Sequence, residues 1–214
     1  MSHQTNAAAN RALIVFARYP RVGLVKTRLA ATLGAESAAA FYRCCAERLF
    51  AEAGRLCCRR YLFYAAEAQA EEMQAWVGPR FTCLAQREGD LGERMAAAFA
   101  RVFAEGNEQA VIVGTDIPDL TAAILTQAFE RLAHEDIVIG PAYDGGYYLL
   151  GMRHLHRELF REMAWSTAAV FEQTLQVVAH LGLQVYHLPM LRDIDTEEDL
   201  RQWLAVRETK RLRE

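Results

Sequence analysis

Lysine is nearly absent from this 214-residue sequence. Among its 24 basic residues only Lys26 and Lys210 are lysines, and all the others are arginines. The ammonium of lysine is compact whereas the guanidinium of arginine is a planar fork, so Lys26 between two arginines hints at a position that needs a compact ammonium. The formal net charge is only -3, which gives no indication of a nucleic-acid partner or an anionic membrane surface.

Long apolar runs are also missing, because none approaches the roughly 18 residues that cross a bilayer. Residues 1–10 are polar and alanine-rich and lack the apolar core of a signal peptide, so we expect a disordered leader there. The cysteines are odd in number, have no CxxC spacing, and include adjacent pairs that cannot readily form disulfides, which indicates reduced thiols and a cytoplasmic protein. They are Cys44, Cys45, Cys57, Cys58 and Cys83.

Several well-known active-site signatures are absent. The sequence has neither the GxxxxGK[ST] nor the GxGxxG spacing of nucleotide-binding loops, no Ser-His-Asp or Cys-His arrangement, and no metal-ligand spacing among its six histidines. With 52% hydrophobic and 24% charged residues, and with no repeat or linker, residues 11–214 fit a single α/β domain. Nothing in the sequence indicates an oligomeric state.

The most informative stretch is the apolar run at 111–113, which ends in Gly114, Thr115 and Asp116. A run that is apolar at every position is typical of a buried parallel strand, and Pro118 takes the chain out of the sheet. Asp116 is therefore expected at the carboxyl end of a central strand, where α/β sheets bind ligands and where a carboxylate suits Mg²⁺ or Mn²⁺. The alternative is that Asp116 caps the next helix or orders the turn.

A second apolar run at 12–17 predicts the first strand, and the loop after it is rich in cations. Pro20 and Gly23 indicate a loop, and we expect a helix to begin near Lys26 or Thr27. Cations that gather around such a loop favour a phosphate site, and the alternative is a solvated basic turn. The four cations are Arg18, Arg21, Lys26 and Arg28.

Three further loops hold polar side chains. Gln86 follows a predicted strand and can offer a donor and an acceptor to a nucleotide base, while Asp90 is better explained as a helix cap. Asp144 precedes two glycines between apolar segments, which predicts a hairpin whose carboxylate could also bind substrate. Thr196 and Asp199 form a capping pair for the last helix, and this leaves Asp195 free to meet the same metal as Asp116.

The remaining pattern alternates strands with helices, which favours a mostly parallel sheet flanked by helices. Further strands are expected at 60–65, 81–85, 136–140, 147–151 and 183–188. Helices are expected at 35–56, 68–77, 91–104, 121–133 and 168–181, the last of them capped by Ser166 or Thr167, and one more follows residue 196.

In order along the chain, these loops resemble the GT-A-fold nucleotide-diphospho-sugar transferase superfamily. More closely, the chain resembles the bacterial radical-SAM/selenodomain-associated glycosyltransferase family, sometimes named for arsenosugar biosynthesis. It is also similar to the guanylyltransferases of deazaflavin-cofactor synthesis, which share a Lys-Thr-Arg-Leu loop. The matching stretches are 16–29, 89–95, 114–118, 144–147, 165–167 and 193–196.

The resemblance implies a Rossmann-like single domain with a nucleotide over the first half of its sheet. Asp116 then matches the superfamily's metal-binding aspartate, and Asp195 supplies the second metal ligand that Ile117 and Pro118 do not. Lys26 and Asp144 join Asp116 as catalytic residues, Asp144 as a general base. The nucleotide and its phosphates are assigned to Arg18, Gly23, Lys26, Arg28, Gln86, Gly114 and Thr115. The substrate is assigned to Gly145, Gly146, Tyr147, Trp165 and Ser166.

Two reactions fit these features. The first is metal-dependent glycosyl transfer from a nucleotide sugar to a small-molecule acceptor, which the family resemblance favours. The second is nucleotidyl transfer from a nucleoside triphosphate with release of pyrophosphate, which suits the cationic loop. A nucleotide-binding module without turnover is the third possibility, because a strict DxD motif is missing after Asp116.

Overall fold

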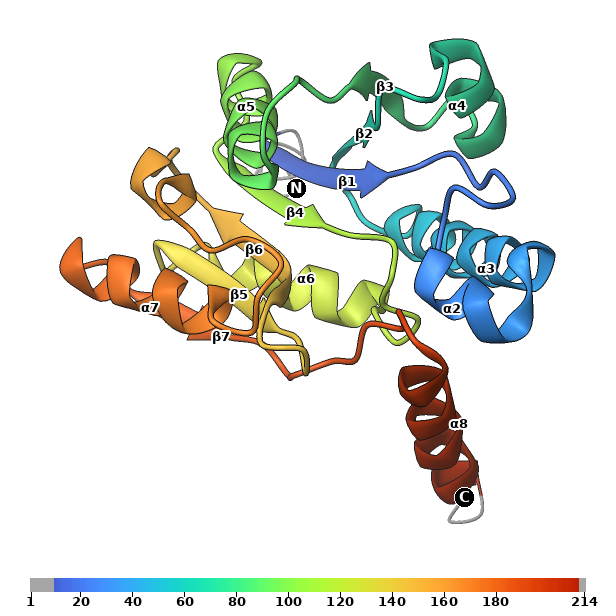
Figure 1. The fold of residues 1–214 in the computed structure, drawn as a ribbon. Coiled ribbons are helices and arrows are strands. Elements are labelled where there is room, and N and C mark those ends of the chain that lie inside the picture. Colours follow the sequence, from blue (N-terminus) through green and yellow to red (C-terminus); the bar gives the residue numbers. More distant parts are fainter. Residues whose placement is uncertain (1–9, 212–214) are drawn as a thin grey trace.

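The apolar runs build a seven-stranded sheet through the middle of the molecule (Figure 1). The computed structural model describes residues 10–211, so the expected leader lies outside the described residues except for Asn10. The strand order is β3-β2-β1-β4-β6-β5-β7, and every neighbouring pair is parallel except the two that β6 makes with β4 and β5. The strands are β1 Arg11–Ala17, β2 Arg59–Tyr64, β3 Thr82–Ala85, β4 Gln109–Val113, β5 Ile137–Pro141, β6 Tyr147–Met152 and β7 Val185–His187.

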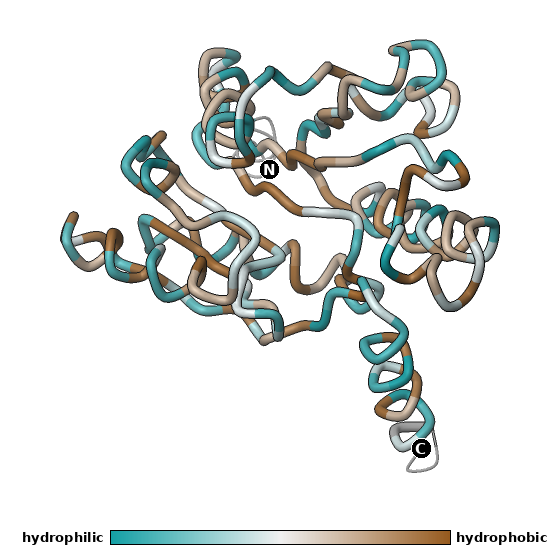
Figure 2. Tube along the Cα trace, viewed as in Figure 1, coloured by the Kyte–Doolittle hydropathy of each residue, from teal (hydrophilic) through white to brown (hydrophobic). Residues whose placement is uncertain are grey.

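Helices cover both faces of this sheet, as a continuously apolar parallel sheet requires. Side chains of β1 alternate between two apolar clusters: Leu13 and Val15 pack with α3, α4 and α6, while Ala12 and Ile14 pack with α5 and α7. Figure 2 shows the apolar strands lying inside these layers. The helices are α2 Thr27–Leu33, α3 Ala35–Ala53, α4 Ala70–Val77, α5 Leu91–Ala104, α6 Ala122–Arg131, α7 Val170–His180 and α8 Glu197–Arg211.

Strand β4 lies at the centre of the sheet, which confirms the position predicted for the run before Asp116. Its residues from Ala110 to Val113 are almost entirely buried, and full burial of each aliphatic side chain stabilises the fold by about 1.5–3 kcal/mol. Because β1 and β4 are adjacent and parallel, the loops after Ala17 and Val113 emerge at the same edge of the sheet. That edge carries the predicted site.

Some local predictions were wrong. The helix expected to begin under Ser166 or Thr167 is α7, whose N-cap is Ala169 without a side-chain cap. Thr167 instead donates its hydroxyl hydrogen to the carbonyl of Ala164, so it stabilises the turn before the helix. A short 3-10 helix, η1 Arg157–Phe160, was not predicted because two apolar residues in four are too few to show a period.

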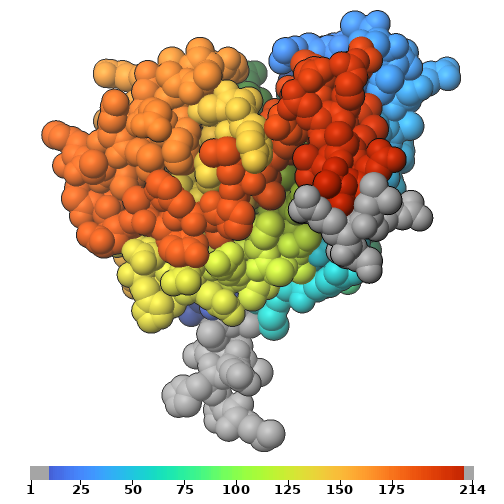
Figure 3. Space-filling view, turned by 90° about the horizontal axis from the view of Figure 1, so that it is seen from below, coloured from blue at the N-terminus to red at the C-terminus, as the bar shows by residue number. Residues whose placement is uncertain are grey.

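The last helix, α8, extends away from the sheet and its base lies against α2 (Figures 1 and 3). Thr196 and Asp199 bond to each other's backbone and side chain at its start, as the predicted capping pair requires. Within residues 10–211 none of the helices combines the length and apolarity needed to cross a membrane.

Candidate active site

A cleft of about 650 Å³ opens at the carboxyl ends of β1 and β4, within the size range of small-molecule sites. Most residues predicted for the site line this cleft, although they come from both ends of the chain. They are Arg18, Lys26, Arg28, Gln86, Gly114, Thr115, Asp116, Asp144, Gly146, Tyr147, Trp165, Ser166 and Asp195. Gly23 and Gly145 are not among the lining residues, so the structure brings together all but two of the predicted set.

At the centre of the cleft edge, Lys26 joins two carboxylates. Its Nζ lies 2.8 Å from Oδ1 of Asp116 and 2.6 Å from Oδ1 of Asp195. The Lys26 side chain is only 3% exposed, whereas those of Asp116 and Asp195 are 43% and 44% exposed. Burial alone would lower the pKa of Lys26, but the two adjacent carboxylates outweigh it and raise that pKa, so the ammonium stays charged. The ammonium therefore sits behind the carboxylates, which face the cleft.

The backbone brings Asp195 to Asp116 by a few specific contacts. The N–H of Ile194 donates to the carbonyl of Asp116 at 3.1 Å, and the Ile194 side chain is fully buried. Further on, within α8, Nε1 of Trp203 donates to Oδ2 of Asp119 at 2.8 Å. These contacts tie the start of α8 to the loop after β4, so the segment before α8 completes the site.

The four cations of the β1–α2 loop and the first turn of α2 have different partners. Arg18 and Arg28 are exposed at the cleft, and Arg18 also lies 3.3 Å from Glu67. Arg21 instead pairs with Glu72 at 2.6 Å and does not line the cleft. Since Lys26 contacts the two aspartates, Arg18 and Arg28 are the two of these four cations that remain available to phosphates.

Tyr42 of α3 is a site residue that the sequence did not reveal. Its hydroxyl accepts a hydrogen bond from the N–H of Arg18 at 2.8 Å and from Oγ1 of Thr115 at 3.0 Å. Burial raises the pKa of this phenol to about 12, so it remains protonated. Tyr42 thus fixes the ends of β1 and β4 relative to each other. In the sequence, Tyr42 has the spacing of the apolar residues on its helix. The one indication of another role was that a buried tyrosine hydroxyl needs a hydrogen-bond partner.

Thr115 and Gln86 line the cleft with their polar groups already engaged. The Thr115 side chain is buried against Tyr42, and its hydroxyl donates there. Nε2 of Gln86 donates to the carbonyl of Phe63, while its Oε1 accepts from Arg94, both at 3.0 Å. These contacts hold the Gln86 amide in one orientation at the cleft wall.

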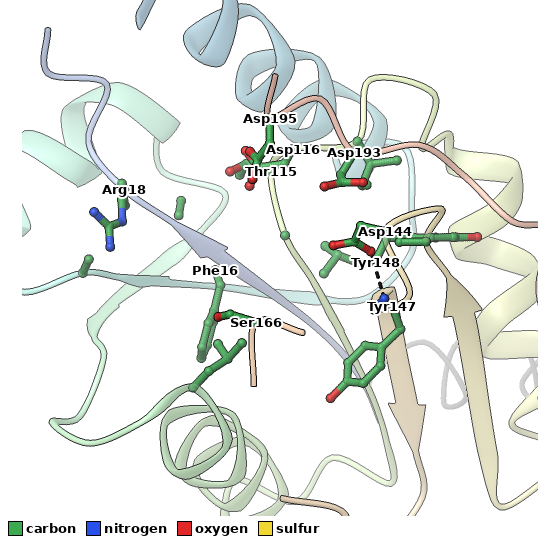
Figure 4. Close-up of a pocket in the computed structure, with 18 of the residues that line it drawn as sticks. Phe16, Arg18, Thr115, Asp116, Asp144, Tyr147, Tyr148, Ser166, Asp193 and Asp195 are labelled. Atoms are coloured by element: carbon green, nitrogen blue, oxygen red, sulfur yellow. Dashed lines mark hydrogen bonds between the residues drawn. The ribbon is translucent and has the colours of Figure 1, made fainter. Parts of the chain in front are cut away.

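The opposite side of the cleft is acidic. Asp144 accepts a hydrogen bond from the N–H of Gly146 at 2.9 Å, which confirms the predicted turn between β5 and β6. Asp193, which we had not proposed as a site residue, lies beside it (Figure 4). Burial raises the pKa of Asp193 to about 6, and the charge of Asp144 adds to the effect. The missed signal was the spacing Asp193-Ile194-Asp195, because alternate residues of an extended segment share a face.

Of the residues predicted to bind the substrate, some line the cleft, whereas Gly145 has a structural role. Gly145 has φ of +88°, and a Cβ on it would lie 2.3 Å from the carbonyl oxygen of Ala168, so it allows close packing of this segment. Tyr147, Trp165 and Ser166 line the cleft, and Trp165 packs so closely on Gly92 that a Cβ there would also clash. Tyr147 and Trp165 provide the apolar wall near the acidic residues.

Asp116 and Asp195 are the carboxylates that could hold a metal ion. Oδ1 of Asp116 is buried against Lys26, so the exposed part of this carboxylate presents Oδ2 to the cleft. Two carboxylates fit Mg²⁺, which is commonly held by one or two of them together with substrate phosphates. Across residues 10–211 there is no cluster of three or more His, Cys, Asp or Glu side chains that could hold a metal by themselves.

Two comparisons concern the sequence. A family model described as "Uncharacterized protein conserved in bacteria (DUF2064)" matches residues 49–167, which is more than half of the chain. No curated protein matches the chain.

Solved structures extend the comparison. A candidate nucleotide-diphospho-sugar transferase from Desulfovibrio desulfuricans G20 is 36% identical, with a TM-score of 0.86 over 90% of this chain and 85% of that one. A 4-diphosphocytidyl-2C-methyl-D-erythritol synthase from Anaerococcus prevotii DSM 20548 is 10% identical, with a TM-score of 0.62 over 97% and 100% of the chains. The manganese complex of Rv0371C from Mycobacterium tuberculosis H37Rv is 15% identical, with a TM-score of 0.54 over 91% and 97%.

The last two structures share the fold alone, whereas the Desulfovibrio protein is a relative over most of both chains. The resemblance drawn from the loops is therefore confirmed: this chain belongs to the DUF2064 family and is a transferase of the nucleotide-diphospho-sugar transferase group.

Proposed function

We propose that this transferase moves a glycosyl group from a nucleotide sugar to a small-molecule acceptor, with Mg²⁺ or Mn²⁺ held by Asp116 and Asp195. The observation that carries the proposal is the convergence of these two carboxylates, 79 residues apart in the sequence (195 − 116), on one point of the cleft. When bound there, the metal would stabilise negative charge on the diphosphate leaving group. Residues 11–214 would form the single functional domain.

The cations at the cleft favour a diphosphate leaving group. Arg94 also lines the cleft but donates to Gln86, Lys26 pairs with aspartates and Arg21 with Glu72, which leaves Arg18 and Arg28 for phosphates. Two arginines match the charge of the diphosphate in a nucleotide sugar better than that of a triphosphate, and their forks bind phosphate oxygens in pairs. The Desulfovibrio relative, described as a nucleotide-diphospho-sugar transferase, supports the same choice.

The acceptor would bind on the acidic side. Asp144 is exposed in the β5–β6 turn, and its Oδ1 is oriented by the N–H of Gly146, so Oδ2 can accept a proton from an acceptor hydroxyl as a general base. Tyr147, Trp165 and Ser166 would form the surface on which the acceptor rests. All five cysteines are free thiols, which supports a cytoplasmic location as part of this proposal.

Nucleotidyl transfer is the competing reaction, since the 4-diphosphocytidyl-2C-methyl-D-erythritol synthase from Anaerococcus prevotii shares the fold. A thermal-shift screen with Mn²⁺ against nucleotide sugars and nucleoside triphosphates separates the two. A ligand at about 100 times its Kd stabilises the folded state by about 2.7 kcal/mol, which is readily seen as a higher melting temperature. Stabilisation by one nucleotide sugar supports glycosyl transfer, whereas selective stabilisation by one triphosphate supports nucleotidyl transfer. Tight binding without turnover would indicate a regulatory module.

A further inference from the structure

Lys26 combines features that a phosphate ligand does not need. Its side chain is almost fully buried at the cleft edge, and its ammonium contacts both proposed metal ligands. We propose that Lys26 is a positioning residue that holds Asp116 and Asp195 together and, through its charge, makes metal binding at this pair depend on the nucleotide's phosphates. The inference rests on the proposed function, because it takes this pair as the metal site.

The local charge balance supports the dependence. Two carboxylates and one ammonium leave the pair with a single net negative charge, so its attraction for a divalent cation is about half that of two free carboxylates. Because the Lys26 ammonium is buried, water and salt screen its repulsion of the metal ion only poorly. The phosphates of a nucleotide would supply the missing negative charge, and they are also the usual partners of carboxylates in Mg²⁺ sites.

The backbone at Lys26 shows that the position is specialised for this side chain. Lys26 has φ of 49° and ψ of 44°, in the left-handed region that a glycine occupies more easily. It is the N-cap of α2 but makes no side-chain cap, so helix capping does not explain it. The side chain at this position instead ends between Asp116 and Asp195, where its ammonium contacts both carboxylates.

The coupling that follows is reciprocal. If bound phosphates raise the affinity for the metal, then the metal raises the affinity for the nucleotide by the same factor. Metal alone should bind weakly, and metal with nucleotide should bind tightly. Replacement of Lys26 by a neutral side chain should remove the repulsion and let the metal bind without a nucleotide.

The test measures Mn²⁺ binding to the full chain by electron paramagnetic resonance of free Mn²⁺, without nucleotide and at pH 8. Lys26→Met should bind Mn²⁺ at least tenfold more tightly than the unmodified chain, and Lys26→Met with Asp116→Asn should lose that gain. Arg153→Met, which removes an exposed cation outside the cleft, should change nothing. Equal or weaker Mn²⁺ binding by folded Lys26→Met would overturn the inference.

A second measurement needs no variant. Because the chain contains only two lysines, labelling their ε-carbons with ¹³C gives two lysine signals in a nuclear magnetic resonance spectrum. Mn²⁺ alone at submillimolar concentration should leave the Lys26 signal sharp. Mn²⁺ added with the four ribonucleoside triphosphates, or with UDP-glucose and GDP-mannose, should broaden it. Broadening by Mn²⁺ alone would contradict the dependence on nucleotide.

These outcomes separate failure of the inference from failure of the proposed function. If the gain in Lys26→Met survives Asp116→Asn, the metal binds elsewhere and the proposed metal site is wrong. If Lys26→Met shows no gain while Asp116→Asn still abolishes metal-dependent donor binding, the metal site stands and only the role of Lys26 is wrong.

Discussion

The two walls of the cleft carry opposite charge. The basic wall, Arg18 and Arg28, comes from the loop after β1 and the first turn of α2, whereas the acidic wall, Asp144 and Asp193, comes from the β5–β6 turn and the segment after β7. Figure 4 shows Arg18 and the acidic pair on opposite sides of the cleft, with Asp116 and Asp195 between them. In the proposed reaction the basic wall holds the donor's phosphates, and the acidic wall faces an acceptor hydroxyl.

The two walls also differ in how far apart their residues lie in the sequence. The basic wall belongs to the parallel half of the sheet, in which the segment after β1, a loop and the start of α2, supplies both arginines. The acidic wall is assembled from two segments about fifty residues apart, beside the antiparallel strand β6. The two arginines are thus supplied by one continuous segment, whereas the two acidic residues come together only when distant segments pack.

The largest effect on donor binding is expected at Asp116, which lies between the two walls. Asp116→Asn should weaken Mn²⁺-dependent binding of the donor by about 100-fold or more, since a metal ion contributes several kcal/mol and each 1.36 kcal/mol is tenfold. Isothermal titration calorimetry with the donor found in the screen measures it. Glu71→Gln, which neutralises an exposed carboxylate on α4, is the control. Unchanged donor binding by Asp116→Asn would remove Asp116 from the metal site.

A substitution in the acidic wall should lower the rate of the reaction rather than the affinity for the donor. Asp144→Asn should lower kcat by about 10²-fold or more, because a general base contributes 10²- to 10⁴-fold, and it should leave the Kd for the donor unchanged. Steady-state kinetics and donor titration together measure this split. Asp136→Asn, just before the other end of β5, serves as the control. A weaker donor Kd with normal kcat would place Asp144 on the donor side.

The basic wall should show the reverse pattern. Arg18→Ala with Arg28→Ala should weaken the donor Kd by about tenfold, since hydrogen bonds to charged groups contribute about 1.5–3 kcal/mol when fully formed and less at an exposed site. Titrations at two salt concentrations measure it. Arg21→Ala offers a matched control in the same loop, because Arg21 pairs with Glu72 away from the cleft. An equal loss in Arg21→Ala would show that the loop as a whole, not its cleft-facing cations, binds the donor.

The smallest functional effect is expected from Tyr42, which is buried behind the basic wall and joins the ends of β1 and β4. Tyr42→Phe leaves the N–H of Arg18 and the hydroxyl of Thr115 without their partner, and should lower the free energy of unfolding by about 1–3 kcal/mol. Urea unfolding measures it. Tyr143→Phe should change stability by less than about 0.5 kcal/mol, because Tyr143 is 58% exposed. Equal stability of Tyr42→Phe and the unmodified chain would show that Tyr42 does not anchor the two strand ends.

The local pattern of apolar and polar residues was sufficient to predict much of the fold. The continuous apolar runs of β1 and β4 predicted parallel, fully buried strands, and from that followed the placement of Asp116 at the carboxyl edge of the central strand. Asp90 caps α5 as predicted, since a capping pair is determined by residues three positions apart. These features depend on nearest neighbours along the chain, which the sequence shows directly.

The rest of the site depends on contacts between distant segments. Lys26 and Asp195 are 169 residues apart, and their contact requires that α8 pack near α2. Sequence reasoning placed Lys26 among the phosphate ligands because its neighbours are arginines, but packing directs it toward the aspartates. The spacing of Asp193 and Asp195 could have placed both on one face, but that this segment after β7 returns to the edge of β4 again depends on packing between distant segments.

The most direct test of the account is a product analysis with the panel of nucleotide sugars and nucleoside triphosphates in the presence and absence of Mn²⁺. Glycosyl transfer predicts release of a nucleoside diphosphate from one nucleotide sugar, only with metal, and its loss in Asp116→Asn. Release of pyrophosphate from a nucleoside triphosphate, with every nucleotide sugar left intact, would contradict glycosyl transfer and assign the cleft to nucleotidyl transfer.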